Sequence, residues 1–153
     1  MRRIAIAAVF LGICCSRTPE PTPRQQSNPA PPPPAPAVRT WSANLFTSGG
    51  YSGGGKGVVF IDFESAKRLS LPLQTELEAA VREARPEKWD TVYSPANDGM
   101  TDQFYYSLRF KIERADGSAG EYAVSWRDAA FGVLPRDLRR LYDALWAAHE
   151  ERR

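Results

Sequence analysis

One stretch of the sequence, residues 104–113, constrains the fold more than any other because apolar and more polar side chains alternate along it. Its apolar positions are Phe104, Tyr106, Leu108, Phe110 and Ile112. A period of two over this length predicts a β-strand with one face in a core. The face that carries Leu108 must therefore be covered by another layer of structure.

Three shorter segments predict the other strands of a sheet: residues 41–46, 58–63 and 122–126. The last of these follows the long strand after a turn that Asp116 and Gly117 mark. Close spacing along the chain favours antiparallel neighbours. We therefore predict four strands, mostly antiparallel.

Two segments carry apolar residues at helical spacing. The first runs from a start at Ser70 through residues 71–84 and ends at Pro86, and the second opens at Pro135. Their stripes are Leu73, Leu77, Ala80, Val81 and Ala84, and Leu134, Leu138, Leu141, Leu145 and Ala148. Two amphipathic helices packed on one face of the sheet would bury both stripes, so the predicted class is α+β.

The start of the chain predicts export. Met1, Arg2 and Arg3 give a positive start, and the uncharged apolar run at residues 4–13 is too short to span a bilayer as a helix. Residues 1–15 therefore suggest a signal peptide. The run closes with Cys14 and Cys15, and its end resembles the Leu-x-small-Cys box of bacterial lipoproteins. We expect a lipid anchor on Cys14 or Cys15 and a location in the cell envelope, at the outer membrane or the periplasmic face; cleavage nearby by an ordinary signal peptidase is the alternative.

Residues 16–39 predict a tether, because nine of the thirteen prolines fall within them. Such a segment has little to bury and favours an extended polyproline conformation. The remaining residues, 40–153, are enough for one small domain. This domain holds fifteen Lys and Arg against seventeen Asp and Glu, so no basic patch indicates nucleic acid. We expect a monomer.

A glycine-rich stretch at residues 47–57 lies between the first two predicted strands. It holds six of the eleven glycines around a single aromatic residue, Tyr51. A plain turn needs only two residues, so a longer loop with a ring near its middle suggests an element offered to a partner. The candidate partner-binding residues are Ser48, Gly49, Gly50, Tyr51, Ser52 and Gly53. A simple mobile connection is the alternative interpretation.

The same stretch is a poor phosphate loop. Gly50, Gly55 and Lys56 have the spacing G-x-x-x-x-G-K, but Gly57 stands where a hydroxyl should hold magnesium. A strand follows where a helix should begin. A nucleotide site is therefore not predicted.

No catalytic constellation is evident in the sequence, so we predict neither an enzyme nor a cofactor. His149, the single histidine, is predicted to be an exposed helix residue. Asp98 and Asp102 share a loop, but their spacing matches no calcium-binding loop. The four tryptophans are predicted to lie in the core or at its edge: Trp41, Trp89, Trp126 and Trp146.

Several elements together carry a resemblance to a known family. In chain order they are Ser48-Gly49-Gly50-Tyr51, a strand ending in Asp62, the helix at 71–84, Asp102-Gln103-Phe104-Tyr105-Tyr106-Ser107-Leu108, Asp116-Gly117, and Leu134-Pro135 with Leu138 and Leu141. This order resembles emfourin, a proteinaceous inhibitor of protealysin and other thermolysin-like zinc metallopeptidases. The resemblance covers about residues 43–149. The run Gly53-Gly54-Gly55 is longer than the family pattern, and Tyr51 stands where Phe is commoner.

The resemblance implies a function for the glycine-rich loop. Thermolysin-like enzymes favour bulky apolar side chains just after the scissile bond, so Tyr51 on a slim backbone would fill that pocket without any metal ligand from the inhibitor. The expectation is a binding protein that inhibits such a peptidase by inserting this loop into the active-site cleft. The alternative is a non-catalytic envelope lipoprotein with a ligand-binding or assembly role.

Overall fold

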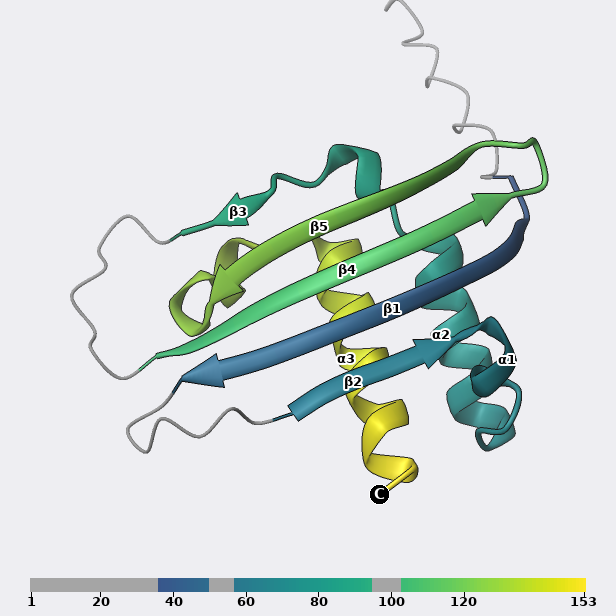
Figure 1. The fold of residues 1–153 in the computed structure, drawn as a ribbon, viewed down its shortest axis with the longest axis horizontal. Coiled ribbons are helices and arrows are strands. Elements are labelled where there is room, and N and C mark those ends of the chain that lie inside the picture. Colours follow the sequence, from purple (N-terminus) through teal and green to yellow (C-terminus); the bar gives the residue numbers. More distant parts are fainter. Residues whose placement is uncertain (1–35, 50–56, 95–102) are drawn as a thin grey trace, which may run out of the picture. The chain divides into compact units, whose positions relative to one another are not determined.

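The computed structural model describes residues 36–49, 57–94 and 103–153. Within these residues the chain forms a five-stranded sheet in the order β2-β1-β4-β5-β3, with α2 and α3 on one face (Figure 1). The strands are β1 (Val38–Gly49), β2 (Gly57–Asp62), β3 (Val92–Tyr93), β4 (Phe104–Arg114) and β5 (Ala119–Arg127). The helices are α1 (Phe63–Ala66), α2 (Leu71–Glu83) and α3 (Arg136–Glu151), with short 3₁₀ segments η1 (Pro86–Lys88) and η2 (Asp128–Val133).

The α+β class is confirmed, and the long alternating segment is β4. Leu108, Phe110 and Ile112 are buried against the helices as their spacing predicts. The helix stripes meet them, with Leu77 and Val81 of α2 and the leucines of α3 in one core. Trp41 and Trp126 are buried in this core, and Trp89 and Trp146 pack at its edge.

The predicted count of four strands and two helices is wrong in the described part of the chain. Val92 and Tyr93 form a fifth strand that runs parallel to β5 and pairs with Ser125 and Trp126, so the sheet is mixed. Two residues are too short to show any period, and this pairing is set by tertiary contacts. The first strand begins at Val38, two residues before the predicted start of the domain.

The second predicted strand ends one residue early because Asp62 begins a helix. Its carboxylate accepts a hydrogen bond from the Ser65 N–H at 2.7 Å, and the Ser65 hydroxyl accepts one from the Asp62 N–H at 2.9 Å. This reciprocal capping box starts α1. These bonds to Ser65 hold the pKa of Asp62 below its ordinary value.

Two salt bridges join the helices on their outer side. The Arg140 guanidinium lies between Glu76 and Glu83, at 2.9 Å from Glu76 Oε1. Glu76 and Glu83 of α2 stay exposed while they pair with Arg140 of α3. His149, predicted to be exposed, is instead partly buried, with its ring centroid 5.6 Å from that of Trp146.

Candidate functional site

Ends of β1, β2, β4 and β5 lie together at one end of the sheet, which we call the hairpin end (Figure 1). Gly49 at the end of β1 pairs with Phe104 at the start of β4, and Tyr105 pairs with Arg127 at the end of β5. Thr47 pairs with Gly57 at the start of β2. The segment 50–56 that joins β1 to β2 therefore leaves and re-enters the sheet here.

Of the predicted partner-binding residues, Ser48 and Gly49 lie in β1, and Gly50, Tyr51, Ser52 and Gly53 lie outside the described residues. Ser48 pairs with Tyr105 and is partly buried. Cys14, Cys15, Asp98 and Asp102 also lie outside the described residues.

Gly49 is required by two separate constraints. Its φ is +109°, in the region that side chains rarely adopt. A Cβ at this position would also lie 2.4 Å from the backbone oxygen of Gln103. Gly57, across the hairpin, has a φ of +120° but open space around it. Both glycines therefore set the direction in which the chain leaves the sheet, and Gly49 alone also permits a close backbone approach.

The strand that Gly49 contacts is fixed by the carboxylate of Asp128. The Phe104 N–H donates to Asp128 Oδ2 at 3.1 Å, and the Tyr106 hydroxyl donates to Asp128 Oδ1 at 2.7 Å. Burial and the bond to Asp128 raise the pKa of Tyr106 far above its ordinary value, so its hydroxyl stays protonated and donates. One side chain from η2 therefore positions the start of β4.

An aromatic cluster supports this arrangement from the helix side. Tyr106 stacks on Trp126 with ring centroids 5.5 Å apart, and Phe131 and Tyr142 contact both rings edge-on at centroid distances of 5.4 to 6.3 Å. Such pairs stabilise beyond their burial, by about 0.5–1.5 kcal/mol each. The aromatic cluster thus packs beside the start of β4 and the end of β5, which form part of the hairpin end.

The sequence did not indicate Asp128 as part of this site. It is an acidic residue after a strand, and only the fold brings it beside Phe104 and Tyr106. The segment 102–106 was singled out through the resemblance, and Gln103 and Phe104 within it form the wall against which Gly49 packs.

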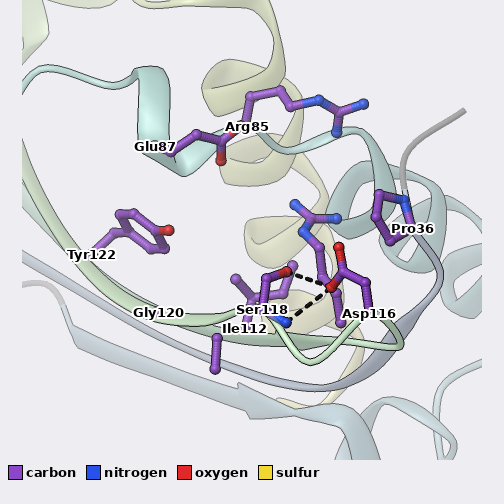
Figure 2. Close-up of a pocket in the computed structure, with 10 residues that line it drawn as sticks. Pro36, Arg85, Glu87, Ile112, Asp116, Ser118, Gly120 and Tyr122 are labelled. Carbon is purple, nitrogen blue, oxygen red and sulfur yellow. Dashed lines mark hydrogen bonds between the residues drawn. The ribbon is translucent and has the colours of Figure 1, made fainter. Parts of the chain in front are cut away.

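A pocket of about 410 Å³ lies at the opposite end of the sheet, between the β4–β5 turn and the segment after α2 (Figure 2). Arg114 Nη2 donates to the Ala84 carbonyl at 3.0 Å, and Arg85 Nη1 donates to the carbonyls of Arg82, Glu83 and Ala84 at 3.1 Å. These bonds satisfy the C-terminal end of α2.

Asp116, a carboxylate in the lining of this pocket, also forms hydrogen bonds within the protein. Asp116 Oδ1 accepts from the Ser118 N–H at 2.9 Å and from its hydroxyl at 2.7 Å, which lowers the pKa of Asp116 and closes the turn (Figure 2). The bonds described for Arg85, Arg114 and Asp116 thus hold local structure.

No group of three or more His, Cys, Asp or Glu residues within 36–49, 57–94 and 103–153 could hold a metal ion. In the same ranges, no helix has both the length and the apolar character needed to span a bilayer. Comparisons with protein-family models, curated proteins and solved structures found no match to this chain.

Proposed function

We propose that this protein inhibits a thermolysin-like zinc metallopeptidase by inserting the glycine-rich segment between β1 and β2 into the active-site cleft. The observation that carries the proposal is the construction of the hairpin end. Gly49 and Gly57 both leave the ladder with positive φ, and Gly49 is held against the Gln103 backbone. A segment held at both ends loses less entropy on binding than a free one.

The chemistry of the segment suits such a cleft. Tyr51 supplies a ring, and the neighbouring glycines keep the backbone slim. Aromatic anchors in pockets commonly carry about 2 kcal/mol or more of an interface. Tyr51 would be that anchor, with Ser48, Gly49, Gly50, Ser52 and Gly53 shaping its presentation.

The test is titration of the full chain against thermolysin and protealysin, with the inhibition constant measured for each variant. Tyr51→Ala should weaken inhibition roughly thirtyfold, and Tyr51→Phe should be nearly neutral because the pocket needs the ring. Gly50→Val should weaken inhibition although the ring remains. If Tyr51→Ala inhibits as well as the parent, the segment is not the inhibitory element.

We also propose export and a lipid anchor on Cys14 or Cys15, which would put the inhibitor in the cell envelope. Changing both cysteines to Ser should release the protein from membranes and abolish palmitate labelling. Unchanged membrane association of the double variant would exclude this anchor.

The second candidate is a non-catalytic envelope lipoprotein with an assembly or ligand-binding role. One observation favours it: large apolar side chains are exposed on the sheet face that the helices do not cover, among them Phe46 and Phe60. A chain that binds an envelope component and inhibits neither peptidase would support this candidate.

A further inference from the structure

The face of the sheet opposite the helices, which we call the open face, is unequal along its length. The strand register arranges its outward residues in rows across the sheet. The first row, nearest the hairpin end, holds Ser48, Tyr105 and Arg127, and the second holds Val58, Phe46, Ser107, Ser125 and Val92. The third row holds Phe60, Asn44, Arg109 and Ala123. The fourth row holds Asp62, Ser42, Lys111 and Glu121.

The large apolar side chains fall in the first three rows. Phe46, Val58, Phe60 and Tyr105 are each 46–56% exposed, and Val92 is 59% exposed. We call this set the apolar patch. Contiguous exposed apolar surface on a soluble domain commonly marks an interaction site. The patch continues directly into the two strand ends that hold segment 50–56.

The charge of the open face also changes between the third row and the fourth. In the first three rows the charged residues are Arg109 and Arg127, and the described residues there include no carboxylate. The fourth row and beyond are balanced by ion pairs, Lys111 with Glu121 at 3.1 Å and Arg39 with Glu113 at 3.2 Å. Arg109 gives this part of the open face a positive charge, which favours an acidic partner.

The relief of the patch favours a structured partner. Phe46 stands between two hollows: one of about 410 Å³ that reaches Val92 and Tyr105, and one of about 310 Å³ beside Val58 and Arg109. The small side chains of Ser107 and Ser125 contribute to these hollows. Hollows beside a central ring suit fixed side chains of a folded protein.

We propose that the apolar patch is a second docking surface for the same metallopeptidase, contacting apolar side chains and a carboxylate beside its cleft. This proposal rests on the proposed function, because the inserted segment would bring that enzyme against the patch. Binding then divides between an inserted loop and a flanking face, with Arg109 opposite the carboxylate.

The test measures binding and inhibition of protealysin and thermolysin by the full chain, three variants of the patch and one control variant. Phe46→Thr with Phe60→Thr should weaken binding at least tenfold with segment 50–56 unchanged. Arg109→Glu should weaken it several-fold and reduce the loss of affinity on adding salt, whereas Arg109→Lys should keep most of the affinity. The matched control is Val133→Thr, at an exposed apolar residue of η2, which should bind as the parent does.

The outcomes separate the two proposals. If the parent inhibits and the Phe46→Thr, Phe60→Thr variant binds equally well, the patch proposal is overturned and the proposed function stands. If the parent binds neither enzyme, the proposed function fails and takes the patch proposal with it. A dimer of the parent that the double variant abolishes, or patch-dependent binding to phosphatidylglycerol vesicles without loss of peptidase binding, would reassign the patch and overturn the proposal.

Discussion

Leu45 and Phe46 are neighbours in β1, yet 1% of Leu45 and 46% of Phe46 is exposed. The helices require apolar residues on the Leu45 side, because only a continuous core stabilises the two layers. Nothing in the fold requires a phenylalanine on the other side, where Ser42, Asn44 and Ser48 also lie. The difference teaches that side chains on the covered face report on folding, whereas apolar ones on the open face report on contacts beyond the domain.

The largest expected effect belongs to the covered face of β4. Leu108→Ala should lower the free energy of unfolding by about 2–5 kcal/mol, as large-to-small changes in a core do. Its neighbour Arg109→Ala, on the open face, should change it by less than about 0.5 kcal/mol. Chemical denaturation measures both. Equal losses at the two positions would break the contrast between the faces.

Gly49→Ala should lower stability by roughly 2–4 kcal/mol, because backbone strain of about 1–3 kcal/mol adds to overlap with the Gln103 oxygen. Gly57→Ala is the control, since it shares the positive φ without the overlap. Its loss should be smaller, at about 1–2 kcal/mol. The two melting curves would coincide if the contact with Gln103 were unimportant.

Adjacent valines of β2 give an isosteric comparison of the two faces. Val59→Thr places a hydroxyl in the core and should cost about 1–3 kcal/mol. Val58→Thr places the same hydroxyl in solvent and should cost less than about 0.5 kcal/mol. Denaturant midpoints would report the difference, and a large loss at Val58 would mean that the open face is covered within the domain.

Asp62 caps α1 where β2 ends, so its effect should depend on pH. Asp62→Ala should cost about 1 kcal/mol at neutral pH. The folded pKa of Asp62 is lowered, so the cap contributes fully above the unfolded pKa of about 3.9 and its contribution is lost as pH falls through the folded pKa. Stability measured from pH 7 to 2.5 should show parent and variant converging in acid. A constant difference would contradict the assignment.

Sequence periodicity predicted the long strand, both main helices and their buried faces, because each contains several turns or alternations. It missed β3, since two residues carry no period. It also missed α1, since a helix of four residues that starts from the capping box of Asp62 and Ser65 is too short to show helical periodicity. It also missed Asp128. A carboxylate that joins Phe104 to Tyr106 through space leaves no mark in the local pattern.

The sequence predicted which residue types make up the candidate site, but not the contacts between distant residues that hold its strand ends together. The glycines around Tyr51 indicated an unusual loop, and Gly49 and Gly57, the two that lie within the described residues, both have positive φ. The contact between Gly49 and Gln103 links residues over fifty positions apart, so no spacing rule could supply it. The sequence placed Phe46 in a short strand but did not show that its ring is exposed, because the buried side of a strand is known only once its neighbours in the sheet are known.

The pairing of β1 with β4 has a kinetic consequence. The hairpins β1–β2 and β4–β5 are local, but eleven register pairs between β1 and β4 join segments with α2 and β3 between them in the chain. Long-range pairings of this kind slow folding, because the loop must close before the contacts stabilise it. We expect the two hairpins to form first and to dock late. Gly49 belongs to one hairpin and Gln103 precedes the other, so the hairpin end is completed only when the two join, and a partially folded chain has no assembled base for its loop.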